Sequence, residues 1–184
     1  MSYIPVLKLP IIINVEVVMQ LFEQIEKKFE DGERCFIVDH YSFQISDNDK
    51  YCQVEFSFNI FSELFDKRRK QIVNSVIEFF TFLWLYSNVK VYTVNIKNFN
   101  DFQFFEINNK KQLNKIIRDV IKCKIDAFFV FEKFRDNSDV YVHLDDVFAL
   151  VYLENIQQLP DIEKIASHCK MHIRKKDEGD KTGL

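Results

Sequence analysis

Glycine is almost absent from this chain. Only three of the 184 residues are glycine, and Gly32 is the one that precedes the charged C-terminal segment. A Walker phosphate loop, a dinucleotide-binding glycine fingerprint and a Gly-x-Ser-x-Gly nucleophile elbow all need glycine where the backbone approaches a phosphate or turns sharply. The scarcity of glycine therefore excludes nucleotide enzymes that depend on such motifs, and α/β-hydrolases.

Proline and alanine are also scarce, with three residues each, the alanines being Ala127, Ala149 and Ala166. Residues with AT-rich codons (Phe, Ile, Lys and Asn) abound, which indicates an AT-rich genome. Part of the excess of 20 Phe therefore reflects mutational bias, and we do not count it as a sign of a ligand pocket.

The four cysteines form no CxxC pair and stand far apart, at Cys35, Cys52, Cys123 and Cys169. Residues 1–13 lack the basic start and the cleavage site of a secretory signal. We therefore expect a cytoplasmic protein with reduced thiols and no disulfide between Cys35 and Cys52.

Charge and hydrophobicity indicate a folded protein. The net charge of −3 gives no reason to expect nucleic acid as a partner, and 47% of the residues are hydrophobic. The only membrane-span candidate, residues 72–86, is shorter than the ~20 residues that a span needs and contains Glu78. We expect neither a nucleic-acid nor a membrane partner.

Hydrophobic periodicity predicts the order βαββαβ for a first half, residues 1–98. Its predicted elements are an extended segment at 3–13, a helix from 15 to Gly32, a hairpin of strands 34–45 and 51–60, a helix from Ser62 to Tyr86, and a strand at 89–96.

The second half, residues 99–174, repeats a similar order. Its predicted elements are a strand at 102–107, a helix capped by Asn108 and ending near Cys123, strands at 125–134, 140–144 and 147–153, a helix from Pro160, and a closing strand near 171–173. The whole predicts an α+β fold of mainly antiparallel sheet and four helices, with two βαββαβ-like halves packed as one unit. Residues 175–184 are expected to be a disordered charged tail.

The most apolar run of the chain, residues 76–86, is predicted to be a core helix. One stripe of it can cover the sheet, but Phe79, Phe82 and Tyr86 lie on other faces. They need a cover from the second half or from a second protomer, so a self-associating structural or regulatory domain, a homodimer, is one alternative.

The strongest chemical constellation is His143-Leu-Asp145-Asp146. An imidazole beside two carboxylates suits a metal ion or acid–base chemistry, so a metal-dependent enzyme is a second alternative. However, aspartates are ordinary turn residues, and strand alternation predicts that His143 faces solvent, opposite to Val142 and Leu144. We expect no metal site, cofactor or catalytic residue.

The absence of a catalytic motif, the mild acidity and the aspartate-rich turns favour a non-enzymatic interaction protein. We expect the partner-binding residues to be Asp136, Asp139, His143, Asp145 and Asp146, which could meet a basic partner. A small inhibitor or an immunity-type factor that neutralises another protein is the leading functional hypothesis.

Overall fold

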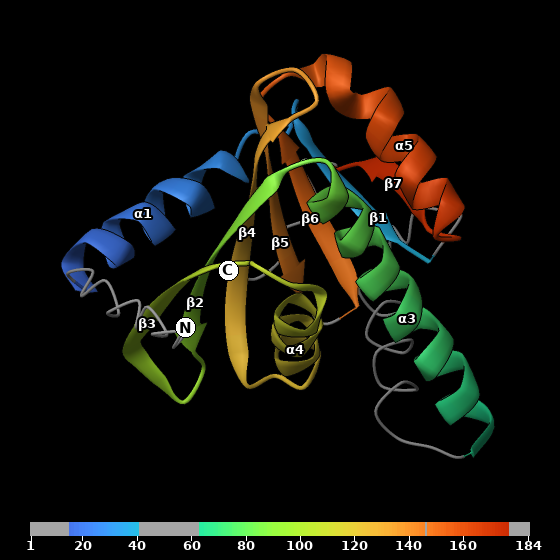
Figure 1. Cartoon of the computed structure of the whole chain (residues 1–184), viewed down its shortest axis with the longest axis horizontal. Coiled ribbons are helices and arrows are strands. Elements are labelled where there is room, and N and C mark those ends of the chain that lie inside the picture. Colours follow the sequence, from blue (N-terminus) through green and yellow to red (C-terminus); the bar gives the residue numbers. More distant parts are fainter. Residues whose placement is uncertain (1–14, 41–62, 146, 177–184) are drawn as a thin grey trace, which may run out of the picture.

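The fold is α+β, as predicted, with four α-helices and one seven-stranded antiparallel sheet among the described residues (Figure 1). A computed structural model of the chain describes residues 15–40, 63–145 and 147–176. The helices are α1 (Val15–Lys28), α3 (Glu63–Leu85), α4 (Lys110–Ile121) and α5 (Leu159–His168), with a short 3-10 helix, η1 (Ile156–Gln158).

The sheet has the order β3-β2-β4-β5-β6-β1-β7, and every neighbouring pair is antiparallel. Its strands are β1 (Cys35–Asp39), β2 (Asn88–Asn95), β3 (Asn98–Glu106), β4 (Ile125–Phe134), β5 (Ser138–Asp145), β6 (Phe148–Leu153) and β7 (His172–Lys175).

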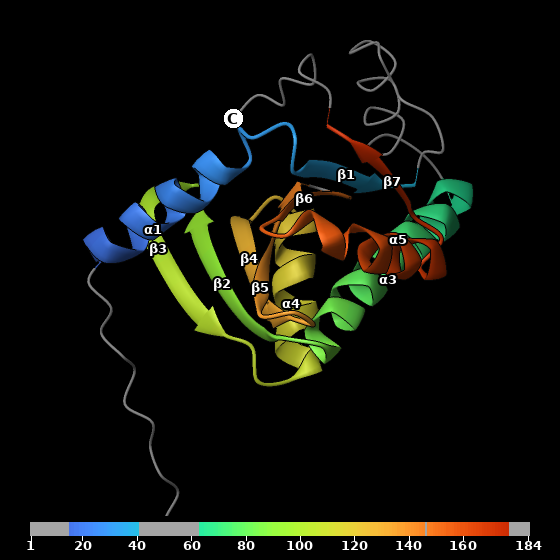
Figure 2. The same ribbon diagram turned by 90° about the horizontal axis from the view of Figure 1, so that it is seen from above.

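Both faces of this sheet are covered by helices. Figure 2 shows α3, α4 and α5 on one side of the curved sheet and α1 on the other. In β4, Ala127, Phe129 and Phe131 pack into the core beneath α3, α4 and α5, whereas Phe128 and Val130 pack beneath α1. The central strands are therefore apolar at successive positions, because neither of their faces meets water.

Helix α1 buries one stripe at helical spacing, Val18, Phe22 and Ile25, which Phe29 continues just past the end of the helix. Phe22 makes an edge contact with Phe128, with ring centroids 4.6 Å apart. This single helix is the cover that the described residues provide for the second face of the sheet.

Helix α4 begins one residue later than predicted. Asn109, and not Asn108, is its N-cap, and the Asn109 side chain accepts a hydrogen bond of 2.9 Å from the Gln112 backbone N–H. Asparagine is a favourable N-cap residue at either position, so which one caps the helix depends on where β3 ends. The Asn108 side chain donates instead to the Glu106 carbonyl.

Helix α3 confirms the predicted core helix, with Phe80 against Phe129 of β4 at a centroid distance of 4.6 Å. Phe79 is fully buried within the single chain. Phe82 is half-buried and lies edge-on to His168 of α5, 4.9 Å away. The second half of the chain thus supplies the cover for these two rings, whereas Tyr86 is 47% exposed.

The predicted hairpin of 34–45 and 51–60 does not form over Cys35–Asp39. Strand β1 has β6 on one edge and β7 on the other, so no edge is left for residues 51–60. The rest of that hairpin, and Cys52, lie outside the described residues. The periodicity identified β1 as a strand but could not identify its neighbours, which follow more than a hundred residues later.

The strands of the two proposed halves share one sheet. β1 lies between β6 and β7, and β2 lies between β3 and β4. Strand β7 also runs to Lys175, into the segment expected to be a tail, because Ile37 and Arg174 pair in register and the Lys176 N–H donates to the Cys35 carbonyl. The internal duplication stays a prediction.

None of the helices in the described ranges combines the length and the apolar character needed to cross a membrane.

Candidate functional site

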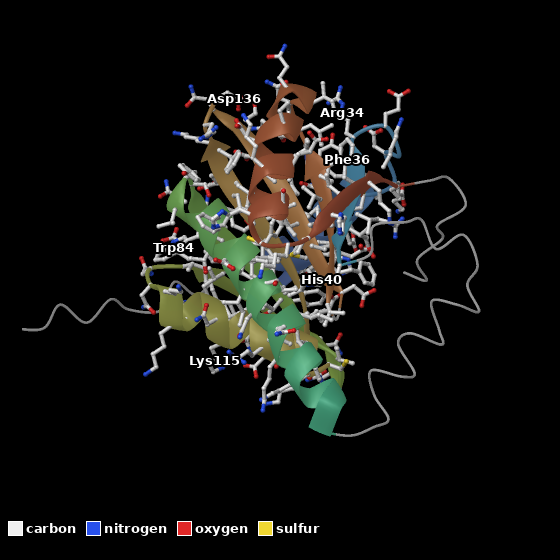
Figure 3. All side chains as sticks on the ribbon, turned by 90° about the vertical axis from the view of Figure 1, so that its right-hand side faces the viewer. Arg34, Phe36, His40, Trp84, Lys115 and Asp136 are labelled. Atoms are coloured by element: carbon white, nitrogen blue, oxygen red, sulfur yellow. The ribbon has the colours of Figure 1, made fainter. Side chains whose placement is uncertain are left out.

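The predicted partner-binding residues do not form one surface. Asp136 and Asp139 lie at the β4–β5 turn, where β5 begins, whereas Asp145 ends β5. The eight residues of β5 span about 25 Å at ~3.3 Å per residue. Figure 3 shows Asp136 near one end of the molecule, with Lys115 of α4 toward the other. Asp146 lies outside the described residues.

Asp136 and Asp139 are engaged in internal hydrogen bonds. The Gln158 amide donates to Asp136 Oδ1 and the Asn155 amide to Asp136 Oδ2, both at 2.7 Å. Asp139 Oδ1 accepts from the Lys133 backbone N–H at 2.9 Å. These carboxylates stabilise the turn, and their part in binding a partner stays a prediction.

The prediction that His143 faces solvent is wrong, because its side chain points into the core beneath α1 and is 6% exposed. Its ring lies 4.5 Å from Phe128 and 6.1 Å from Phe29, centroid to centroid. Side chains along β5 alternate between two faces of the sheet that are both buried. His143 lies on the face beneath α1, and Val142 and Leu144 lie on the opposite face.

The His143 ring is held by a carboxylate on the neighbouring strand. Nε2 lies 2.8 Å from Asp126 Oδ1, and Nδ1 is buried without a hydrogen-bond partner among the described residues. Asp145 follows two positions along β5 on the same face of the sheet. Desolvation raises the pKa of the Asp145 carboxyl, with His143 opposing the rise and Asp126 adding to it.

This arrangement fixes the orientation of the imidazole, but a general acid or base must also reach a substrate proton. The deep burial of His143 gives no such access. Within the described part of the chain, no group of three or more His, Cys, Asp or Glu side chains is arranged to hold a metal ion. Asp126 and His143 thus form a hydrogen-bonded pair beneath α1, and the alternative of a metal site at His143, Asp145 and Asp146 stays a hypothesis, since Asp146 lies outside the described residues.

A different feature stands out at the β4–β5 turn. Lys133, Arg135 and Asn137 adopt positive φ angles of 54°, 58° and 64°. Asn tolerates this left-handed region, but lysine and arginine lose about 1–2 kcal/mol per residue there. Glycine would avoid that loss, so the turn holds two side chains at positions where folding alone favours none.

Gln158 of η1 holds this strained turn in place. Its side chain is buried, and its amide nitrogen lies within hydrogen-bonding distance of the Phe134 carbonyl (2.9 Å), the Ser138 carbonyl (3.1 Å) and Asp136 Oδ1 (2.7 Å). Strained backbone persists only where its surroundings over-determine it, and it concentrates at functional sites. The turn is therefore rigid and pre-shaped.

The turn presents Arg135 on the ring of Tyr86. The Arg135 guanidinium lies 5.0 Å from the Tyr86 ring centroid and forms an ion pair with Asp161 of α5. The Tyr86 ring is supported from below by Phe134, with 6.2 Å between centroids. Tyr86 thus lies between one buried aromatic ring, which it meets edge-on, and one exposed cation.

Two further exposed apolar side chains come from the end of α3 and from η1. Leu85 ends α3 and is 63% exposed, and Ile156 is 47% exposed. Ile156 lies between Asn155 and Gln158, which both bond to Asp136 of the turn. We call Leu85, Tyr86, Arg135 and Ile156 the Tyr86 corner.

Sequence reasoning identified only Tyr86 of this corner. The turn itself was predicted, from Arg135 to Asp139, but its backbone angles were not. Nothing in the order of residues indicates that α3, the turn and η1 meet at one point.

A second polar network ties α1 to the sheet near the same end of β5. Lys28 Nζ lies 3.2 Å from Glu154 Oε1 and 4.4 Å from the centroid of the Tyr141 ring. Desolvation alone would raise the pKa of Glu154, but hydrogen bonds from the Asp139 N–H, Lys28 and Tyr141 hold that pKa below its usual value. These contacts are internal and anchor the C-terminal end of α1.

The sequence matches no protein-family model, and neither the curated proteins nor the solved structures that were compared with it gave a match.

Proposed function

We propose that this protein binds another protein through the Tyr86 corner. The observation that carries the proposal is Arg135, an arginine kept in a left-handed backbone conformation and stacked on an exposed tyrosine. Glycine would serve the turn better if folding were its only task. Cys123 and Lys170 also have positive φ angles, so this backbone conformation is not peculiar to the turn, and the exposed guanidinium on Tyr86 is the feature that a contact outside the chain would use.

The composition of the corner supports this proposal. Tyrosine and arginine are enriched among the residues that carry most of the binding energy at protein interfaces. Leu85 at the end of α3 and Ile156 of η1 add exposed apolar surface, and exposed apolar surface that is contiguous marks interaction sites. Because Gln158 fixes the turn in advance, ordering of the turn on binding costs little.

The corner also indicates the chemistry of the partner. A guanidinium carries five N–H donors, and the ion pair with Asp161 occupies only part of them. A partner that places an apolar side chain on Leu85 and Tyr86, and a carboxylate or carbonyl oxygen on Arg135, would fit. This differs from the basic partner expected from Asp136 and Asp139, whose carboxylates are bonded within the turn.

A role as an inhibitor or immunity-type factor inside the cell is the specific form of this proposal. A small protein with a rigid corner of this kind can block the working surface of another protein without any chemistry of its own. The form of the role depends on which protein the corner binds.

The test uses two glycine substitutions that relieve the same backbone strain. Arg135→Gly removes the guanidinium from the corner, whereas Lys133→Gly, the matched control, changes an exposed residue that no corner contact uses. Leu85→Glu adds a charge to the most exposed apolar side chain of the corner. Affinity capture from lysate of the source cells would compare the wild-type protein with the three variants.

We expect a stoichiometric partner protein with wild-type protein and with Lys133→Gly, and its loss with Arg135→Gly and Leu85→Glu. Circular dichroism and urea unfolding would establish that all four proteins are folded. Recovery of no stoichiometric partner, or recovery that Arg135→Gly and Leu85→Glu leave unchanged, would contradict the proposal.

A further inference from the structure

The two edges of the sheet differ in how they are protected. Strand β7 has four residues, of which His172, Arg174 and Lys175 are basic or titratable. Strand β3 has nine residues, and Asp101 and Glu106 are its only charges. Short and charged edge strands resist pairing with other chains, whereas long, weakly charged ones invite it. Among the described strands, β3 has β2 on one side and none on the other.

The edge at β3 also carries aromatic side chains. Phe102 and Phe104 are only half-buried, although both pack against the core beneath α1. Such an edge is an aggregation hazard unless another strand pairs with it. A protein that remains in solution with this edge therefore has a reason to cover it.

Helix α1 extends the same surface. Its N-terminal half projects past β3 in Figures 1 and 2 and carries Val17 and Met19, which are 45% and 38% exposed. These apolar side chains lie on the α1 side of the sheet, beside the uncovered edge. If a strand of another sheet paired with β3, the elements that cover that sheet would come close to Val17 and Met19.

We propose that β3 pairs with β3 of a second copy of this chain, antiparallel, with a two-fold axis at Phe102. Phe102 is the midpoint of the strand, whose pairing with β2 is regular from Phe102 to Glu106 and shifts register between Phe102 and Asn98. The axis at Phe102 sets Asp101 opposite Gln103 of the second copy, and Asn98 opposite Glu106. Each carboxylate thus meets a neutral amide side chain.

The neighbouring symmetric registers are worse. A two-fold axis at Asp101 opposes two aspartates, and like charges directly opposite each other destabilise a sheet. An axis at Gln103 leaves Asn98 and Phe99 unpaired. The Asp101 and Gln103 side chains are already suited to each other, since Gln103 Nε2 donates to Asp101 Oδ1 at 3.0 Å within one strand.

Pairing in this register keeps the two α1 helices on one face. Directly opposite residues of an antiparallel pair point to the same side of a sheet, and Phe102 opposes itself. The two sheets therefore become one, with both α1 helices above the junction. Val17 and Met19 of the two copies then approach each other across the axis.

The first test is the oligomeric state of purified full-length protein by sedimentation equilibrium from about 1 to 100 μM. We expect a dimer for the wild-type protein. Gln103→Glu places carboxylates opposite Asp101 at two symmetric positions and should weaken the dimer about tenfold or more. Gln103→Lys reverses the charge and should strengthen it. Arg135→Gly, which alters the Tyr86 corner, should leave the dimer unchanged.

The second test fixes the register with single cysteines at exposed or half-exposed positions in a Cys123→Ser background. Asp101→Cys and Gln103→Cys chains, refolded together and oxidised, should give a disulfide-linked dimer in the mixture. Neither variant alone should, because like positions lie diagonally across the axis and out of disulfide reach.

A monomer at all concentrations would overturn the proposal, as would a dimer indifferent to both substitutions at Gln103. Efficient cross-linking of Gln103→Cys alone would place the axis elsewhere and also overturn it.

Discussion

Replacing Gln158 with alanine tests whether the β4–β5 turn is held by one side chain. The amide nitrogen of Gln158 is within hydrogen-bonding distance of three acceptors: the Phe134 carbonyl, the Ser138 carbonyl and Asp136. An amide has only two N–H groups, so two of these distances amount to one shared bond. Gln158→Ala therefore removes the equivalent of two full hydrogen bonds at a site where Gln158 is 3% exposed.

The expected loss follows from three contributions. Two hydrogen bonds contribute ~2 kcal/mol together, and leaving the Phe134 carbonyl buried without a donor adds about 1–2 kcal/mol. Asp136 loses less, because Asn155 still donates to its other oxygen. Release of one of the two left-handed conformations, at Lys133 or Arg135, returns about 1–2 kcal/mol if that residue relaxes. We expect a net decrease of about 2 kcal/mol in the free energy of unfolding.

Urea unfolding followed by circular dichroism measures this difference. A slope of about 2 kcal/mol/M predicts a midpoint lowered by ~1 M for Gln158→Ala with an unchanged slope. Gln157→Ala is the matched control, since the Gln157 side chain is exposed and only its backbone N–H bonds within η1. A loss below ~0.5 kcal/mol, or a loss equal to that of Gln157→Ala, would refute the assignment of Gln158 as the residue that fixes the turn.

Three further predictions follow from the same contacts. Lys133→Gly should raise the free energy of unfolding, measured in urea, by ~0.5–1 kcal/mol. The reason is that relief of the positive φ angle (about 1–2 kcal/mol) exceeds the entropic cost of the more flexible unfolded chain. A decrease in the free energy of unfolding would contradict the assignment of backbone strain to Lys133. Glu154→Gln should destabilise the protein at pH 7, and progressively less as the pH falls through the lowered pKa of Glu154, because a carboxyl of depressed pKa stabilises the fold only while it is ionised. Urea titrations at several pH values test this. A difference in the free energy of unfolding that stays constant with pH would argue against the network. Burial raises the pKa of the Cys35 thiol to about 11 and that of the Cys169 thiol to about 12. A disulfide reagent at pH 8 should therefore modify exposed Cys123 in native protein, and Cys35 and Cys169 only after unfolding. Prompt modification of Cys35 or Cys169 in native protein would show that its site opens.

Local pattern was sufficient for most of the described elements. The strand predicted at 125–134 is confirmed with the same bounds, because seven of its ten residues are apolar and the unbroken run from Ala127 to Phe131 leaves no helical stripe. The helix after Ser62 and the helix that contains Pro160 are confirmed for similar reasons. Cap assignment erred by one residue between Asn108 and Asn109, which lie within the ordinary uncertainty of a helix boundary.

Pairing and facing could not be obtained from pattern alone. The hairpin assigned to Cys35–Asp39 failed because neighbours in sequence are only the default neighbours in a sheet, and β6 and β7 occupy both edges of β1. The prediction that the His143 side chain faces solvent failed because it assumed that one face of the sheet meets water. In the structure, α1 buries that face. Both errors arise from the arrangement of layers, which no window of the sequence contains.

The candidate site was even less accessible from sequence. Asp136 and Asp139 are predicted from the sequence to bind a partner. In the structure their carboxylates accept hydrogen bonds from Asn155, next to η1, and from Lys133, at the β4 end of the same turn. Arg135 was passed over because its importance lies in its φ angle and in its position on Tyr86. Those features exist only after α3 and the turn have met.

The position of β1 between β6 and β7 sets an order of events during synthesis. Asp39 contacts Arg174 across 135 positions of the chain. A ribosome adding about 5–20 residues per second needs on the order of ten seconds to supply that partner. Until β6 has been translated the apolar strand Cys35–Asp39 has neither of its neighbours, and until β7 follows it has only one. A newly made chain therefore cannot close this side of the sheet until almost all of it has been translated. Chains released early, even ones that already contain α1 and β2 to β5, would expose β1 and would be substrates for chaperones.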